Sequence, residues 1–372
     1  MKKIAIIGAG ISGLFFANLL KDNLEYDFTI FEKKEKIDLE DGYGIQLSVN
    51  SIKLLNKIGF KNISKNEIYN PKKIKFFNAK NIKKICDLDI SKFNFENNKY
   101  TTLKRSTLLQ FLLKNIPNDK IKFNFELTNL SYSKKLDLSF NNDFNEKFDY
   151  LIVSDGVFSN TKSLILKKKA KPKYFNSLAL RANIYDHSFE DISIYFGSNF
   201  HYVIYPLNQK KEYNFILIIK KKLLDKKLYK DEVFLNSIKQ ELYQKTELKL
   251  DGELKNIKSF PIYISDKLEF SKNKNIFFIG DALYAIPPSL AQGASQSIES
   301  SKELYDKIEN DKTEYYKKRI KKLNSINWRS KLNYFIFHLS NPFFLLFRNL
   351  ILKFLVKNNK FLESYLGKIY RD

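Results

Sequence analysis

The chain has 372 residues, 44% of them hydrophobic, and a formal net charge of +24 at pH 7. A chain of this length can bury the core of a globular protein, and it should divide into about two domains. The single cysteine, Cys86, excludes an intrachain disulfide and is typical of a reducing compartment, so we expect a cytoplasmic protein. No segment has the roughly 18 uncharged apolar residues of a membrane-spanning helix.

The positive charge does not by itself indicate a nucleic-acid-binding protein. Lysines are spread along the whole chain among asparagine, isoleucine and phenylalanine, which indicates a general compositional bias rather than a basic patch. No nucleic-acid-binding signature and no metal-ligand cysteine pattern occurs, so we expect neither a nucleic-acid partner nor a metal site. The alternative that stays open is attraction of an anionic substrate or a membrane surface.

The first predicted elements are an apolar, β-branched strand over residues 2–7 and a helix over residues 14–20, joined by the glycine pattern G-x-G-x-x-G. Its glycines are Gly8, Gly10 and Gly13. In a dinucleotide-binding unit the first permits a tight turn, the second lets the backbone approach a pyrophosphate, and the third lets the helix lie against the sheet. Free N–H groups at the helix start, around Ser12, would then bind the diphosphate.

The next strand, expected over Asp27–Glu32, ends in a carboxylate nineteen residues after Gly13. Glu32 at this point can accept hydrogen bonds from both hydroxyls of a ribose, and its charge repels a 2′-phosphate. The opening unit therefore predicts bound FAD or NAD in preference to NADP.

Strand and helix patterns continue through the rest of the chain. The expected elements are a loop or strand over 42–50, a helix over 51–58, short strands within 69–98, a helix over 103–113, strands over 121–128, 136–140 and 148–154, strands throughout 173–264 with one helix near 231–247, a strand over 275–279 and a helix over 295–304. Two interleaved domains fit this order best. The dinucleotide-binding domain would comprise 1–68, 99–172 and 265–330, the strand-rich domain 69–98 and 173–264, and a C-terminal helical segment 331–372.

Three motifs, in order and at suitable distances, resemble those of the single-component FAD-dependent aromatic hydroxylases of the para-hydroxybenzoate hydroxylase fold. They are the opening glycine pattern, Asp155-Gly156-Val157-Phe158-Ser159, and Gly280-Asp281-Ala282 with Pro288 and Ala291-Gln292-Gly293-Ala294. The stretches Gly44–Ser48 and His201–Pro206 are most similar to the salicylate hydroxylase and 3-hydroxybenzoate 6-hydroxylase branch. The resemblance implies an α/β fold. A Rossmann-like, glutathione-reductase-type FAD domain would be interleaved with a strand-rich substrate domain and followed by C-terminal helices.

The motifs also imply cofactor contacts. Asp281 follows a buried strand, so its carboxylate can accept a ribityl hydroxyl, with Gly280 providing the turn. Gly293 and Ala294 open a helix whose N–H groups can stabilise negative charge on a reduced isoalloxazine. By resemblance, Arg105 lies near the FAD diphosphate, and Asp155 with Gly156 holds FAD. The alternatives are a solvated arginine and a turn aspartate.

Two positions depart from the usual family pattern. Tyr284 stands where histidine is usual, and Lys162 where arginine is usual. Lys162 puts the contacts to the pyridine nucleotide in doubt. The choice between NADH and NADPH stays open, because the resembled family has no separate pyridine-nucleotide domain and Glu32 concerns the FAD ribose.

In the resembled family, NAD(P)H reduces FAD, O₂ adds to the flavin, and the flavin hydroperoxide hydroxylates an electron-rich phenol. A histidine is suited to draw the proton from that phenol. Strand alternation places His201, Val203 and Tyr205 on one face. By resemblance His201 is the base, and Tyr205 and Gln292 orient the substrate. The alternative for His201 is a sheet histidine that is satisfied by its neighbours. Arg181 could pair with a carboxylate of the substrate, and the alternative for this residue is an exposed strand arginine.

The apolar stretch over 341–356 is interrupted by Arg348 and Lys353, so it should not span a bilayer. We favour a terminal helix packed in the core; the alternative is peripheral contact with a membrane surface or a prenyl tail.

The leading functional hypothesis is an FAD- and NAD(P)H-dependent monooxygenase that uses O₂ to hydroxylate a small phenolic or hydroxybenzoate-like substrate. There are two alternatives. One is a ubiquinone-biosynthesis-type hydroxylase that acts on a polyprenyl phenol, and the other is a flavoprotein reductase without hydroxylation. A monomer and a homodimer are both compatible with the sequence.

Overall fold

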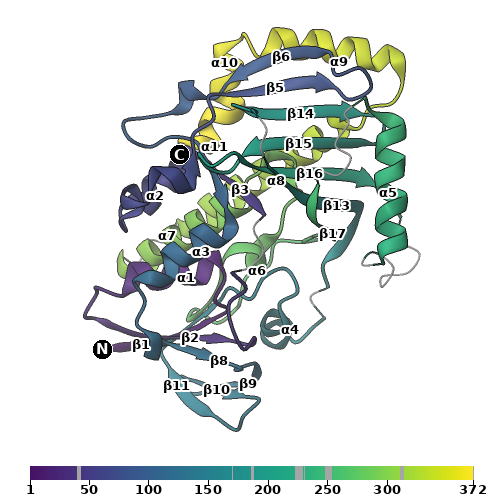
Figure 1. Ribbon diagram of the computed structural model, residues 1–372. Helices are drawn as coiled ribbons and strands as arrows, with labels where there is room; N and C mark the ends of the chain where they lie inside the picture. The colour runs from purple at the N-terminus through teal and green to yellow at the C-terminus, as the bar shows by residue number, and fades with distance from the viewer. Residues whose placement is uncertain are drawn as a thin grey trace.

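The computed structural model describes residues 1–39, 43–169, 171–185, 188–222, 229, 231–247, 254–310 and 314–371. Gly42, at the start of one predicted run, and His187, one of the three histidines, lie outside the described residues. The molecule has a parallel sheet at one end, a larger strand-rich layer at the other, and C-terminal helices that connect the two (Figure 1).

The first layer is a five-stranded parallel sheet in the order β18-β12-β1-β2-β8. Its strands are β1 (Lys2–Ile7), β2 (Tyr26–Glu32), β8 (Ile121–Phe123), β12 (Tyr150–Val153) and β18 (Ile276–Phe278). Alternation in β1 divides the core: Ile4 and Ile6 pack against the helices on one face, and Ala5 and Ile7 pack under a small antiparallel sheet on the other. The helices are α1 (Ile11–Leu20), α3 (Arg105–Lys114) and α7 (Gly293–Asn310); the small sheet is β9 (Leu127–Tyr132), β10 (Leu136–Phe140) and β11 (Asn145–Phe148).

The second layer is a seven-stranded sheet in the order β17-β13-β16-β15-β14-β5-β6. Its strands are β5 (Lys73–Asn78), β6 (Lys84–Asp89), β13 (Lys173–Tyr185), β14 (Ile192–Gly197), β15 (Phe200–Pro206), β16 (Glu212–Lys220) and β17 (Lys255–Ile264). Side chains alternate between two faces, so Tyr202, Ile204 and Leu217 pack under α5 (Glu232–Lys245), and the other face lines a cavity.

A short three-stranded sheet joins the two layers. It consists of β3 (Gly44–Leu47), β4 (Ile68–Tyr69) and β7 (Thr101–Lys104), next to α2 (Val49–Asn56). The Gly44 N–H donates to Asn214 Oδ1 at 2.8 Å, and the Thr102 hydroxyl donates to the carbonyl oxygen of Pro206 at 2.5 Å. These bonds hold the edge of the large sheet to the nucleotide-binding layer. The short helices α4 (Asn160–Leu166) and α6 (Gly280–Tyr284) follow β12 and β18.

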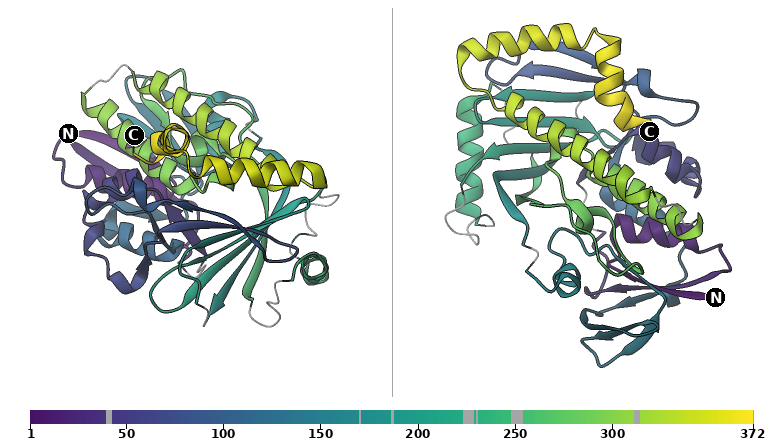
Figure 2. Two further views of the ribbon diagram at one scale, coloured as in Figure 1. Left: turned by 90° about the horizontal axis from the view of Figure 1, so that it is seen from above. Right: turned by 180° about the vertical axis from the view of Figure 1, so that it is seen from behind.

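The C-terminal part is helical, as predicted. Its helices are α8 (Tyr315–Phe337), α9 (Pro342–Leu355), α10 (Asn359–Leu362) and α11 (Lys368–Tyr370), with a π-helical turn at Glu363–Gly367. The long α8 runs across both layers, and α9 lies along the outer edge of the large sheet (Figure 2). No described helix is both long enough and apolar enough to cross a membrane.

The favoured interpretation of residues 341–356 as a core helix is wrong for most of its apolar side chains. Seven large apolar side chains of α9 are between 49% and 68% exposed, and only Arg348 is buried. The hydrophobic pattern could not show this outcome, because an apolar helix face is the same in sequence whether it meets a core or the outside of the molecule.

The predicted fold class is confirmed, with two local differences. The predicted helix over 103–113 begins only at Arg105, because Thr101–Lys104 pairs as β7 with β3. The predicted strand over 121–128 is interrupted at Asn124, whose φ of +62° breaks the extended conformation between β8 and β9. The proposed domain boundaries stay a prediction.

Candidate active site

The first cavity of the candidate site lies at the carboxyl ends of the parallel strands β1, β2 and β12. Its volume is about 340 Å³. Of the residues predicted to bind the cofactor, the following line it: Gly8, Gly10, Glu32, Arg105, Asp155 and Gly156. Parallel strands end at the same edge of their sheet, which is where this class of fold binds its ligands.

The glycine positions differ in what surrounds them. A Cβ on Gly13 would lie 2.2 Å from the Gly8 carbonyl oxygen, so α1 approaches β1 too closely for a side chain. Gly8 itself has a φ of +101°, in the left-handed region. A Cβ on Gly10 would meet nothing within 4 Å, so this residue faces open space in the cavity.

Two carboxylates flank the glycine turn. Glu32 accepts from the backbone N–H of Ala9 at 2.9 Å and from that of Lys34 at 3.0 Å, so one of its oxygens braces the turn. Asp155 has a buried Oδ1 without a hydrogen-bond partner among the described residues. Burial raises the pKa of Asp155 above its ordinary value, which a donor from a ligand would reverse. The space over Gly10 and this unsatisfied acceptor both fit a bound dinucleotide.

Ser12, a predicted cofactor residue, and the two positions that depart from the family pattern, Lys162 and Tyr284, lie outside the first cavity. The Ser12 side chain packs against Gly280: its Oγ would lie 2.5 Å from a Cβ added there. Lys162 is buried and its ammonium donates to the Leu283 carbonyl oxygen at 3.3 Å, and burial lowers its pKa. Tyr284 accepts from Asn327 Nδ2 at 2.9 Å through its hydroxyl. The two departures from the family pattern are therefore engaged inside the protein.

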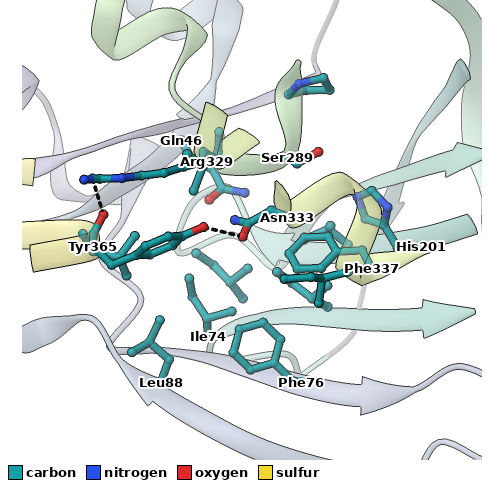
Figure 3. Close-up of a pocket in the computed structure, with 18 of the residues that line it drawn as sticks. Gln46, Ile74, Phe76, Leu88, His201, Ser289, Arg329, Asn333, Phe337 and Tyr365 are labelled. Carbon is teal, nitrogen blue, oxygen red and sulfur yellow. Dashed lines mark hydrogen bonds between the residues drawn. The ribbon is translucent and has the colours of Figure 1, made fainter. Parts of the chain in front are cut away.

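The second cavity, of about 770 Å³, lies between the large sheet and the helices that follow β18 (Figure 3). Its floor is a row of side chains that are aligned across neighbouring strands: Arg181, Ile216, Val203, Ile194 and Phe76. Four of the five are apolar, so Arg181 is the charged end of an otherwise apolar row. Ile74 and Leu88 continue the apolar floor toward β6.

Residues from the nucleotide-binding layer reach the same cavity. Asp281, Gly293 and Ala294 line it, all three predicted to contact the flavin part of FAD. The Asp281 carboxylate is accessible from inside the cavity but is surrounded by protein, and this desolvation raises its pKa to about 6. A Cβ on Gly293 would meet nothing within 4 Å, so the start of α7 is open toward a ligand.

The predicted alignment of His201, Val203 and Tyr205 is confirmed, since all three line this cavity. His201 is nevertheless engaged: its Nδ1 lies 2.8 Å from Nε2 of His338. Desolvation, and the nearby His338, hold the pKa of His201 well below its usual value. Desolvation, with a contribution from Lys220, lowers that of His338 to about 3. Both rings are therefore neutral near pH 7.

The direction of the hydrogen bond between the two rings decides what His201 can do. If His201 Nδ1 carries the proton, its Nε2 is an acceptor; if His338 Nε2 carries it, His201 Nε2 must be the protonated nitrogen and a donor. No described residue bonds to His201 Nε2. Between the two alternatives for His201, a base and a histidine satisfied by its neighbours, the structure shows a histidine that is satisfied on one nitrogen only.

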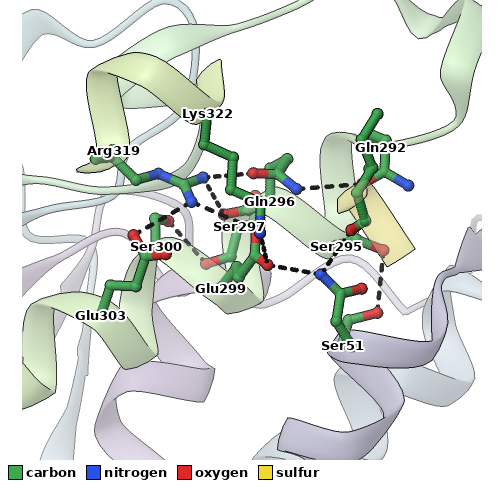
Figure 4. A network of polar contacts seen from close by, with 12 residues as sticks. Ser51, Gln292, Ser295, Gln296, Ser297, Glu299, Ser300, Glu303, Arg319 and Lys322 are labelled. Atoms are coloured by element: carbon green, nitrogen blue, oxygen red, sulfur yellow. Dashed lines mark hydrogen bonds and ion pairs between the residues drawn. The ribbon is translucent and has the colours of Figure 1, made fainter. Parts of the chain in front are cut away.

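Gln292, predicted to orient the substrate, does not line the second cavity. Its Oε1 accepts from Gln296 Nε2 at 3.1 Å, one helical turn along, and Gln296 accepts from Arg319 at 2.7 Å (Figure 4). Buried Arg319 also pairs with Glu299 at 3.4 Å, and Lys322 pairs with Glu299 at 2.5 Å. This network of α7 and α8 engages the amide oxygen of Gln292 and braces the first turn of α7.

The sequence analysis missed several polar residues of the second cavity. Arg329 donates to the carbonyl oxygen of Tyr365 at 2.6 Å, and the Tyr365 hydroxyl donates to Asn333 Oδ1 at 2.8 Å (Figure 3). These three line the cavity from the C-terminal helices. They belong to no local motif, and neither does His338.

Comparison with known proteins agrees with this geometry. The FAD binding domain family matches residues 1–314. An FAD-dependent monooxygenase of Gibberella moniliformis is 25% identical over 339 residues, which are 80% of this chain and 74% of that protein. Klebsiella pneumoniae HpxO, in complex with FAD and uric acid, has a TM-score of 0.84 at 15% identity, covering 98% of this chain and 97% of that one. A salicylate hydroxylase substrate complex has a TM-score of 0.78 at 16% identity, covering 100% and 95%. At these identities the two solved structures show the fold alone.

The family match covers most of the length of the chain. The chain therefore belongs to the FAD binding domain family of flavin-dependent monooxygenases, as its motifs predicted.

Proposed function

We propose that the protein is an NAD(P)H-dependent hydroxylase of a phenolic or hydroxybenzoate-like ring, which it binds in the second cavity. One observation carries the proposal. Asp281 and the start of α7, which are predicted to bind the flavin end of FAD, line this cavity. His201, Tyr205 and Arg181 line it too. An apolar floor with a few polar groups suits an aromatic ring with polar substituents.

The residues of the two cavities divide the binding of FAD between them. Those of the first would hold the adenosine and diphosphate part, and Asp281, Gly293 and Ala294 the flavin part. FAD, when bound, supplies electron transfer from NAD(P)H to O₂ and the oxygenation of the ring. The protein's own part is to orient the ring, exclude water and manage the phenol proton.

His201 is proposed to accept the hydrogen bond of the phenol through Nε2. This requires the tautomer in which His201 Nδ1–H donates to His338, so His338 is a positioning residue that selects the tautomer. The low pKa of both rings keeps them neutral, and a neutral imidazole can act as an acceptor.

Arg181 and Tyr205 are proposed to orient the substrate. Burial raises the pKa of Tyr205, so it is a neutral hydroxyl, and Arg181 is close enough to oppose part of that shift. No ion pair joins Arg181 to a described residue, so its guanidinium is available to a substrate carboxylate.

A second candidate is a hydroxylase of a prenylated phenol. The apolar part of the cavity continues past the polar end to the C-terminal helices, where Leu352, Val356 and Phe361 line it. This wall suits a hydrocarbon tail, which a hydroxybenzoate lacks.

The proposal is tested by measuring NADH and NADPH oxidation by the purified FAD-loaded protein with salicylate, 3- and 4-hydroxybenzoate and a short-chain prenylphenol, together with product analysis. We expect one phenol to stimulate oxidation and to yield a hydroxylated product, and the preferred phenol separates the two candidates. Oxidation that no phenol changes, with hydrogen peroxide as the only product, would instead indicate a reductase.

A further inference from the structure

Helix α9 exposes a broad apolar face on the side that is turned away from the rest of the protein. Seven side chains that lie within one half of the helix circumference are exposed: Phe343, Phe344, Leu346, Phe347, Leu350, Ile351 and Phe354. The buried residue of this helix is a cation, Arg348, whose guanidinium lies 4.6 Å from the centre of the Phe196 ring. A helix that turns arginine inward and phenylalanine outward is arranged for an apolar exterior.

The charges that the C-terminal helices place beside this face have one sign. No Asp or Glu occurs from Tyr315 to Leu362, whereas three exposed lysines are present: Lys353 in the last turn of α9, Lys357 after it, and Lys360 in α10. Helix α9 packs beside β6, where Lys84 pairs with Asp87 at 2.6 Å and Asp89 is a further carboxylate, so the cations that border the apolar face come from the C-terminal helices. The apolar face is therefore bordered by cations, the pattern of helices that lie in the headgroup region of anionic membranes.

We propose that α9 docks the protein on an anionic phospholipid surface, with its exposed apolar side chains between the headgroups and the flanking lysines on lipid phosphates. The helix has 14 residues and is about 21 Å long, too short to cross a bilayer and sufficient to lie in its surface. A second copy of this chain would leave the lysines at the C-terminal end of α9 without anionic partners, whereas an anionic lipid surface supplies them.

The docked helix is also a wall of the second cavity. Leu352, Leu355 and Val356, on the side of α9 opposite its exposed face, line that cavity together with the exposed Trp328 of α8. Docking would therefore bring the cavity wall next to the acyl chains, from which an apolar phenol could enter. This consequence rests on the proposed function; the docking itself does not.

The test is co-sedimentation of the full-length FAD-loaded protein with vesicles of phosphatidylcholine, or of equimolar phosphatidylcholine and phosphatidylglycerol. We expect binding to the anionic vesicles that weakens with salt, and little binding to the zwitterionic ones. The triple variant Phe347→Ser/Leu350→Ser/Phe354→Ser should bind roughly tenfold or more weakly. Lys353→Glu/Lys357→Glu should lose the preference for anionic vesicles. The matched control Leu24→Ser/Val233→Ser, which removes exposed apolar side chains elsewhere, should bind as the unchanged protein does.

Three results would overturn the proposal: no binding of the unchanged protein to anionic vesicles, equal binding of the triple serine variant, or a dimer in sedimentation velocity that the triple variant abolishes while vesicle binding persists. None of the substituted residues lines the second cavity. Vesicle binding needs no turnover, so failure of the docking is separate from failure of the hydroxylase proposal, which the phenol panel measures without vesicles.

Discussion

His201 Nδ1 and His338 Nε2 lie 2.8 Å apart, although 137 positions separate them in the chain. The bond joins β15, in the floor of the second cavity, to the C-terminal end of α8. The tautomer of His201 is coupled to the direction of this hydrogen bond, and so to a residue that does not itself line the cavity.

This relationship predicts unequal effects of substitutions at His338. His201→Gln should lower kcat for the phenol substrate about a hundredfold, the usual scale for a lost acid–base group. His338→Leu should lower kcat and change its pH profile, because His201 loses the partner that selects its tautomer. His338→Gln, which can place an amide oxygen near the original Nε2, should restore much of kcat. Steady-state kinetics with FAD content as the folding control would check this series; equal activity of the leucine and glutamine variants would contradict it.

The same pair predicts a loss of stability in acid. Both histidines have lowered pKa values in the folded protein, so below about pH 6.5 the unfolded chain takes up protons that the folded protein does not. Each should reduce the free energy of unfolding by about 1.4 kcal/mol per pH unit as the pH falls from 6.5 toward the folded value.

Urea unfolding of the apoprotein near pH 7 and near pH 5 would measure this slope. The variant His201→Gln/His338→Gln should show a flatter dependence. Asp281, whose raised pKa acts in the opposite direction as the pH falls through about 6, is present in both proteins and cancels in the comparison. An unchanged slope in the double variant would show that the histidines are not the titrating groups.

Two glycines of the opening motif form a matched pair. Gly13→Ala should destabilise the apoprotein, because the new Cβ would lie 2.2 Å from the Gly8 carbonyl oxygen and α1 would have to move. Gly10→Ala should leave the apoprotein as stable, since nothing lies within 4 Å, but should weaken FAD binding by filling the cradle. Thermal unfolding and FAD titration separate the two effects; unchanged FAD affinity of Gly10→Ala would place the diphosphate elsewhere.

The buried network behind α7 predicts that replacing its arginine, Arg319, lowers the free energy of unfolding by a large amount. Arg319→Met leaves Glu299 with one cation fewer and Gln296 without its donor, and should cost about 3–5 kcal/mol of unfolding free energy together with a loss of FAD affinity. The control Arg371→Met removes an ion pair with Glu363 that is largely exposed and should cost less than about 1 kcal/mol. Equal costs in denaturant unfolding would show that burial of the network is unimportant.

Much of the nucleotide-binding half was predictable from the sequence because its signals are local. The spacing of Gly8, Gly10 and Gly13, and the place of Glu32 after a strand, are set within one βα unit, and the structure places Gly8, Gly10 and Glu32 at one cavity. Likewise, period-two alternation was sufficient to put His201 and Tyr205 on one face.

What only the tertiary structure decided depends on contacts between distant segments. Gln292 precedes a helix in the sequence, which does not show where its amide points. In the structure Arg319 of another helix holds the Gln296 side chain, and Gln296 donates to the Gln292 amide oxygen. The partner of His201 comes from the end of α8, and seven apolar side chains of α9 face outward while Arg348 lies inward beside Phe196. Periodicity determines which residues share a face; only packing determines what that face meets.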